Sequence, residues 1–171
     1  VGSLSNTALT PDSILIRQMR TDAFMTLVAN GAITEFGADP TADVTAAGLI
    51  LSAGSGIGTT GNAIETQVTF LEAETTTGGI NLANSGSVQI GGLTPDVAGM
   101  NVVTSGNINF VNNGFILLAD GTGGSLVHGG DIWGNVTLTA VGVDSDIFSN
   151  IDQRVIMAAG GAITLNAGRD V

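Results

Sequence analysis

The sequence has 171 residues, enough for one domain with a hydrophobic core; 43% are hydrophobic but only 4% are aromatic. Four arginines and no lysine stand against 15 acidic residues, and the formal net charge of −11 excludes nucleic acid as a partner and disfavours anionic lipid. The chain has no cysteine, which excludes disulfides and a thiolate zinc site, and no apolar run long enough to span a bilayer, so we expect no membrane insertion.

The N-terminal part is predicted to change from a lead-in to strands. Residues 1–12 are polar and read as a loose lead-in. Two short runs follow, Ile14–Ile16 and Phe24–Val28, whose β-branched and alternating residues favour strands. A helix over Asp12–Met25 is the alternative.

From Gly31 onward one short phrase recurs, in which one or two glycines precede an alternating strand headed by a β-branched residue. The spacing of the leading glycines is irregular but fits a coil of about 20 residues or more with variable loops. We expect the longest loops at Gly54–Asn62, Thr94–Met100 and Val143–Gln153. The leading glycines of the predicted coils are Gly31, Gly48, Gly79, Gly106, Gly130 and Gly161.

Such a repeat predicts an all-β solenoid. Each strand has one apolar face, which a single coil cannot bury, whereas stacked coils form a continuous core and pair their backbone groups. Glycine and asparagine suit the corners because they tolerate positive φ, and stacked Asn or Thr side chains can form ladders along the axis. The sequence therefore predicts one domain, residues 13–171, built as a parallel β-helix of about six to eight coils.

Three runs resemble the repeats of filamentous haemagglutinin-type large bacterial exoproteins: Gly48–Thr59, Thr77–Gly86 and Gly161–Val171. The resemblance covers roughly residues 23–171. It implies a right-handed parallel β-helix, an extracellular location on the bacterial cell surface, and a stalk used in adhesion. It transfers no catalytic or binding residue to this chain.

The strongest catalytic pattern is Asp144-Ser145-Asp146. Residues two apart on an extended backbone face the same side, so these carboxylates could bind a cation or act as a carbohydrate-cleaving pair. A solvated acidic turn is the simpler interpretation, and we expect no catalytic residue and no cofactor. Whether the chain binds a metal stays open at this stage.

Three further features have ordinary structural interpretations. Asp120–Gly124 is predicted to be a turn because it lacks the tandem glycine-rich calcium pattern. The only histidine, His128, is expected to be exposed or hydrogen-bonded. Trp133 is expected to pack against the core or a loop, although an exposed tryptophan could stack on a sugar ring.

The function predicted from the sequence is structural and not enzymatic: a stalk or filament segment of a bacterial surface exoprotein. Its expected partners are a host or neighbouring-cell surface or a glycan. The sequence stops at Val171, in mid-phrase after a strand, so we expect either that it is cut from a longer solenoid or that its ends meet copies of itself in end-to-end self-association. The alternative is a carbohydrate-active enzyme or glycan-binding module on the same scaffold.

Overall fold

The structure is a computed structural model that describes residues 12–97, 99–119, 127–150 and 155–171. The predicted lead-in, apart from Asp12, and the predicted turn Asp120–Gly124 lie outside the described residues.

Within the described ranges all regular secondary structure is strand, and no helix is present. The strands are β1 (Ile14–Ile16), β2 (Met19–Arg20), β3 (Phe24–Ala29), β4 (Ile33–Glu35), β5 (Val44–Thr45), β6 (Gly48–Ala53), β7 (Ile64–Gln67), β8 (Phe70–Thr77), β9 (Ile80–Ser85), β10 (Val88–Ile90), β11 (Met100–Ser105), β12 (Ile108–Asn113), β13 (Ile116–Leu118), β14 (Val127–Gly129), β15 (Val136–Val141), β16 (Ile147–Ser149), β17 (Ile156–Met157) and β18 (Ile163–Ala167). The helix considered over Asp12–Met25 is wrong, because β1, β2 and the start of β3 occupy it.

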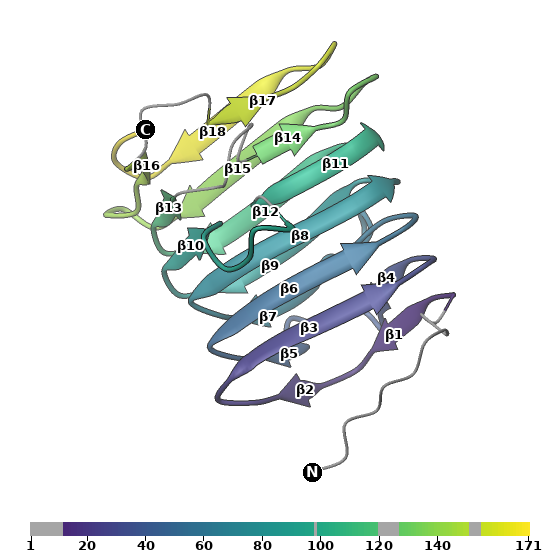
Figure 1. The fold of residues 1–171 in the computed structure, drawn as a ribbon. Helices are drawn as coiled ribbons and strands as arrows, with labels where there is room; N and C mark the ends of the chain where they lie inside the picture. The colour runs from purple at the N-terminus through teal and green to yellow at the C-terminus, as the bar shows by residue number, and fades with distance from the viewer. Residues whose placement is uncertain (1–11, 98, 120–126, 151–154) are drawn as a thin grey trace.

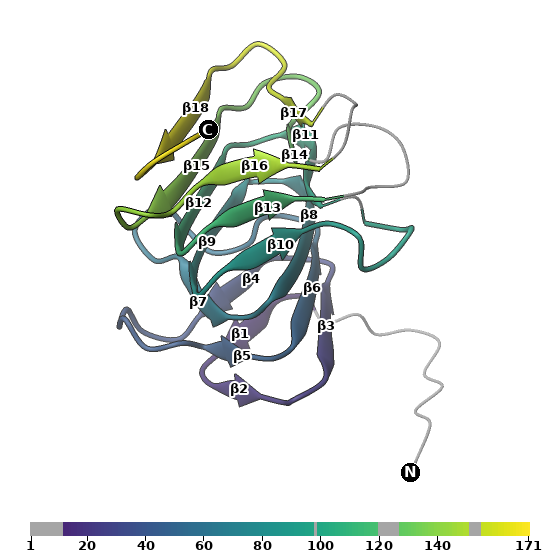
Figure 2. The same ribbon diagram turned by 90° about the vertical axis from the view of Figure 1, so that its left-hand side faces the viewer.

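The strands form parallel sheets that wind around a common axis (Figures 1 and 2). One sheet has nine strands and includes β3, β6, β8, β11, β14 and β17, together with β10, β13 and β16. A second has seven strands in the order β18-β15-β12-β9-β7-β5-β2, and β1 pairs with β4. The predicted all-β parallel β-helix, or β-solenoid, is confirmed.

Parallel pairing places each residue of one coil next to the equivalent residue of the neighbouring coil. In one such column, strand pairs and isolated bridges link Ile14, Ile33, Ile57, Ile80, Ile108, Val136 and Ile163. Hydrogen-bonded partners on neighbouring coils are 19 residues apart at Ser13 and Ala32 but 28 apart at Asn81 and Asn109. The coils therefore lengthen along the chain while the stacking register is kept.

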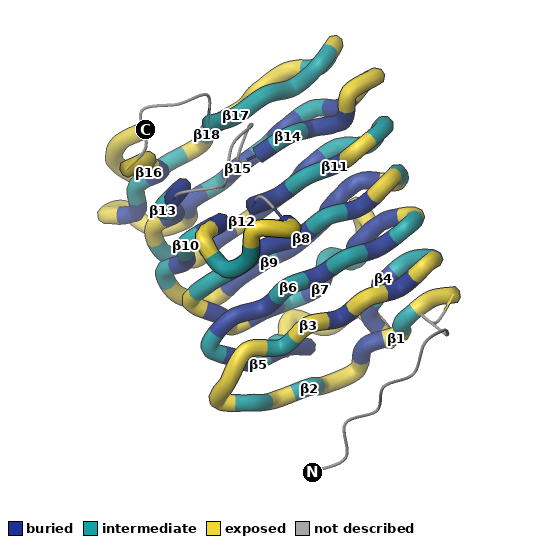
Figure 3. Tube along the Cα trace, viewed as in Figure 1, coloured by how far each residue is buried: buried dark blue, intermediate teal, exposed yellow. Residues whose placement is uncertain are grey.

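The interior of the coil is one apolar column (Figure 3). Residues at equivalent positions stack on one another; Leu82, Phe110 and Leu138 are in register and almost completely buried. The alternating pattern predicted for the strands explains this, because every second side chain of a strand faces the core. Phe110 is the largest of the fully buried side chains.

Glycines form a column where the chain turns into the seven-stranded sheet. A Cβ on Gly106 would clash with the backbone of Gly79, one on Gly134 with the carbonyl of Gly106, and one on Gly161 with that of Gly134. Only a residue without a side chain allows the coils to approach this closely. A second glycine directly follows four strands of this sheet, β9, β12, β15 and β18, at Gly86, Gly114, Gly142 and Gly168.

This column corrects the predicted repeat at two positions. Gly48 begins β6 in the nine-stranded sheet, so it occupies a different position of the coil from Gly79. Gly134, and not Gly130, is the equivalent of Gly106 before β15. The glycine-headed phrase occurs at more than one corner, which made the coil length look irregular. The predicted loop Val143–Gln153 is also interrupted, by β16.

Asparagine ladders run along the axis, as the sequence predicted. The strongest is buried: the Asn84 side chain accepts hydrogen bonds from the Thr66 hydroxyl and the Val68 amide, each at 2.9 Å. It also donates to Asn112 Oδ1 at 2.9 Å, and Asn112 donates to the carbonyl of Phe115 at 2.9 Å. Every polar group of this ladder has a partner, so it can replace apolar residues inside the coil.

We expect Asn84→Ala to lower the free energy of unfolding by roughly 3 kcal/mol, because it leaves several buried donors and acceptors without partners. Asn113→Ala is the matched control, since Asn113 ends the neighbouring strand with its side chain exposed, and it should cost less than about 0.5 kcal/mol. Urea unfolding followed by circular dichroism measures both. Equal losses for the two variants would show that the ladder does not stabilise the fold.

Candidate functional site

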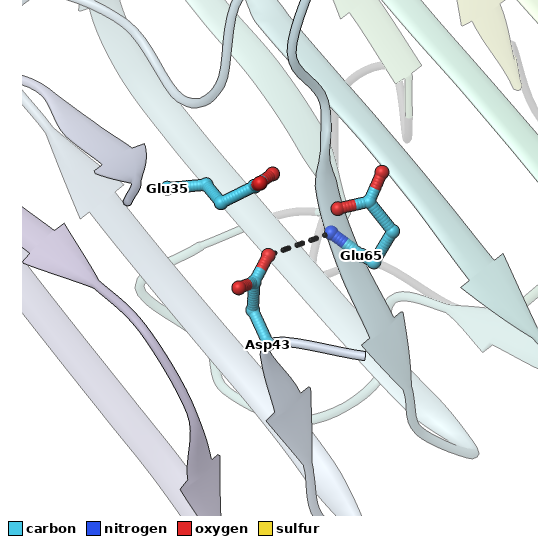
Figure 4. A group of neighbouring side chains, drawn as sticks. All are labelled: Glu35, Asp43 and Glu65. Atoms are coloured by element: carbon cyan, nitrogen blue, oxygen red, sulfur yellow. Dashed lines mark hydrogen bonds between the residues drawn. The ribbon is translucent and has the colours of Figure 1, made fainter. Parts of the chain in front are cut away.

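Three carboxylates gather at one corner of the N-terminal coils (Figure 4). Glu35 is the last residue of β4, Asp43 directly precedes β5, and Glu65 lies in β7. We call Glu35, Asp43 and Glu65 the acidic corner. Parallel pairing of β5 with β7 sets Asp43 beside Glu65, and the loop between β4 and β5 returns Asp43 towards Glu35.

The backbone fixes this arrangement. The Asp43 amide donates to the Glu65 carbonyl at 2.8 Å, and the Glu65 amide donates to Asp43 Oδ2 at 3.2 Å. The amide of Asp39 donates to Glu35 Oε1 at 3.4 Å. One carboxylate oxygen from each member of the acidic corner lies within 4.8 Å of the others.

The acidic corner is largely removed from solvent. Glu35 is 6% exposed, Asp43 is 4% exposed and Glu65 is half-buried. Glu35 Oε2 and Glu65 Oε2 are buried without a hydrogen-bond donor. An ionised carboxylate accepts hydrogen bonds but cannot donate them. Two facing carboxylates therefore satisfy each other only if a proton or a cation lies between them.

No protein cation neutralises the acidic corner within the described residues. The ion pairs of the described residues lie elsewhere, and they join Arg169 to Asp146 and Asp170, and His128 to Asp131. Arg17, from the turn after β1, places its guanidinium 4.4 Å from the centre of the exposed Phe36 ring. The three carboxylates of the acidic corner thus lie close together where little water reaches them, and this disfavours the ionisation of all three at once.

The pKa values reflect this environment. Burial, followed by the charges of Glu35 and Asp39, raises the pKa of Asp43 to about 6, although the hydrogen bond from the Glu65 amide opposes the shift. Burial, followed by the facing Glu35 carboxyl and the charge of Asp43, raises the pKa of Glu65 to about 7. The acidic corner can therefore hold a proton near neutral pH or exchange it for a metal ion.

Glu72, in β8, is a buried acid whose carboxylate, unlike those of the acidic corner, is fully hydrogen-bonded. It is fully buried, and its carboxylate accepts hydrogen bonds from the amides of Leu93 and Thr94 and from the Thr94 hydroxyl. These contacts fasten the loop after β10 against the sheet. Glu72 has donors for both oxygens, whereas Glu35 Oε2 and Glu65 Oε2 of the acidic corner have none.

The structure gives the two carboxylates of Asp144-Ser145-Asp146 different surroundings. Asp146 forms an ion pair with Arg169, and this hydrogen bond lowers the pKa of Asp146. Ser145 is buried and donates to the Val141 carbonyl at 2.8 Å, while Asp144 is exposed. Asp146 thus has a structural partner that the sequence analysis did not foresee.

The remaining candidates, His128 and Trp133, differ in exposure. His128, in β14, has a mostly buried ring with Nε2 3.3 Å from Asp131 Oδ1. Trp133 is 49% exposed, and its backbone bridges to Ser105. These residues lie on different coils from the acidic corner.

Sequence reasoning missed the acidic corner because its members are 8 to 30 residues apart and belong to two coils. One signal was present. Glu35 follows Ile33 by two residues in a strand, so it faces the same side as a core isoleucine, and an acid at such a position needs a partner.

Comparison with protein-family models, curated proteins and solved structures finds no match to this chain. In the part of the chain that the structure describes, no helix has the length and apolar character needed to cross a membrane.

The raised pKa values predict that metal-free protein loses stability as pH rises. The folded state holds more protons than the unfolded chain between the ordinary carboxyl pKa values near 4 and the folded values of about 6 and 7. The loss begins above about pH 4 and is complete above about pH 7. In chelator-treated protein we expect the free energy of unfolding to be lower at pH 8 than at pH 5 by about 2 kcal/mol.

Chemical denaturation at the two pH values measures this difference. Glu65→Gln should reduce it, because the amide does not ionise and can donate to Glu35. The lowered pKa values of Asp39 and Asp146 add stability that is lost only below about pH 4, outside this window. Wild-type protein that is more stable at pH 8 than at pH 5 would contradict the prediction.

Proposed function

We propose that this chain is a structural stalk or filament segment of a bacterial cell-surface exoprotein that supports adhesion. The observation that supports it is the continuous interior column, in which each coil is stabilised by its neighbours through parallel ladders and shared apolar packing. A stack of this kind gives length and a regular outer surface. The resemblance of the repeats to exoprotein repeats favours the cell surface.

The outer surface fits a structural role. Side chains that point away from the core pair between successive coils: Asn109 donates to Asn81, which is itself buried, at 3.0 Å, and Asn101 to Glu74 at 2.9 Å. Asp146 is likewise paired with Arg169. These contacts direct polar side chains along the axis, where they link coils.

The C-terminal coil supports the proposal of end-to-end association. Leu165 and Val171 contribute to an apolar depression together with Ile147, Phe148 and Ile156. Ile163 of β18 is exposed on the coil above β15. A coil of a second copy could cover this surface in the same parallel manner.

One observation favours a second candidate, a glycan-binding module. Trp133 is half-exposed next to the exposed Ile132, and an accessible indole can stack on a sugar ring. Binding of an oligosaccharide that Trp133→Ala abolishes, with Phe148→Ala as the exposed aromatic control, would favour this candidate.

The stalk proposal is tested on bacteria that produce the protein. Fab fragments raised against the purified chain should label intact cells and reduce their attachment to surfaces or to other cells, because a stalk is accessible from outside. Fab fragments against a cytosolic protein are the control. Labelling that requires permeabilised cells, with unchanged attachment, would contradict the proposal.

A further inference from the structure

The strongest unexplained feature is the acidic corner, where two buried oxygens, Glu35 Oε2 and Glu65 Oε2, have neither a hydrogen-bond donor nor a counter-charge among the described residues. Glu35 is more than nine-tenths buried, and its Oε2 has no partner. Figure 4 shows the three side chains converging from neighbouring strands. Burying an unpaired carboxylate is costly, and such groups are usually paired or bound to a metal.

We propose that Glu35, Asp43 and Glu65 form a binding site for one divalent cation, and that Ca²⁺ is the ion that fits it best. The three side chains supply only oxygen ligands and a formal charge of −3, which suits a hard cation. The ion would supply the positive partner that the buried oxygens lack.

The ligand set favours Ca²⁺ over Mg²⁺. The ligand atoms of the acidic corner lie within 4.8 Å of one another, so one ion can contact all three side chains. Mg²⁺ demands near-ideal octahedral geometry and gives up its water reluctantly, whereas Ca²⁺ takes about six to eight oxygen ligands in flexible geometry. Ca²⁺ also accepts the irregular geometry that three side chains from two coils provide.

Solvent can complete the coordination shell. A surface depression of about 290 Å³ adjoins Glu65 and is lined by residues of the two loops that flank the acidic corner, including Asp39 and Asn62. Asn62 donates to the Gly37 carbonyl, which holds these loops together. The depression has room for water ligands and for entry of the ion.

The proposed ion has a structural consequence. Glu35 and Asp43 flank the loop of one coil, and Glu65 belongs to the next coil, so a bound ion would join the coils on the side where the backbone leaves its regular ladder. Calcium would then stiffen the N-terminal part of the stack. This inference does not depend on the proposed surface function.

The test begins with chelator-treated full chain at pH 8, titrated with CaCl₂ or MgCl₂. We expect one equivalent of Ca²⁺ to bind by calorimetry, and saturating Ca²⁺ to raise Tm by about 5 °C, with a smaller rise for Mg²⁺. In ¹H–¹⁵N spectra of the wild type, the amides of Asp39, Thr41 and Glu65 should shift most. No binding, or shifts spread over the whole acidic surface, would overturn the proposal.

Variants assign the ligands. Glu35→Gln and Glu65→Gln should each weaken Ca²⁺ binding at least tenfold, whereas Asp144→Asn, which removes an exposed acid elsewhere, should bind like the wild type. Equal binding by all three would overturn the proposal. If Glu35→Gln fails to fold, the wild-type spectra and Glu65→Gln decide between the outcomes.

Discussion

The structure depends on parallel backbone pairing between successive coils. Each coil is too thin to have a core of its own, so its apolar side chains are buried only when the next coil lies in register above it. The pairings of β9 with β12 and of β12 with β15 keep equivalent residues in register over six positions, and buried Leu82, Phe110 and Leu138 consequently form one column. Glycines at the corners and asparagines in the ladders are consequences of this close stacking.

The acidic corner arises where this regularity is weakest. In the later coils one long strand, such as β9, occupies the region, whereas the early coils break it into short strands joined by the loops around Pro40 and Gly61. Backbone pairing is reduced there, and three acids occupy the gap. Burying these acids costs free energy, and a proton or a cation can offset that cost. Stabilisation by a proton weakens as pH rises, whereas stabilisation by a metal ion strengthens because metal binding needs deprotonated ligands.

The sequence was sufficient for the fold because the signal is repeated. Glycine-headed strands such as Gly79-Ile80 and Gly106–Phe110 occur in several coils, so errors at single positions, as at Gly130, did not change the predicted solenoid. The candidate site had no such repetition. The three acids of the acidic corner are not part of the repeated pattern. Their proximity depends on the paths of two loops, which the local sequence does not reveal. Asp144 and Asp146 looked like a stronger candidate site because they are only two residues apart in the sequence, but the pairing of Asp146 with Arg169 requires knowledge of the adjacent coil.

The register of the stack is tested most directly by disulfide crosslinking, because the chain has no native cysteine. Val111 of β12 and Thr139 of β15 are parallel partners on the outer face. Stacked coils predict that Val111→Cys combined with Thr139→Cys oxidises readily to an intramolecular disulfide in the folded protein, since partners about 4.8 Å apart permit the bond. Val111→Cys combined with Asn166→Cys, two levels apart, should not crosslink. Equal crosslinking of both pairs, or of the distant pair alone, would contradict the stacked solenoid.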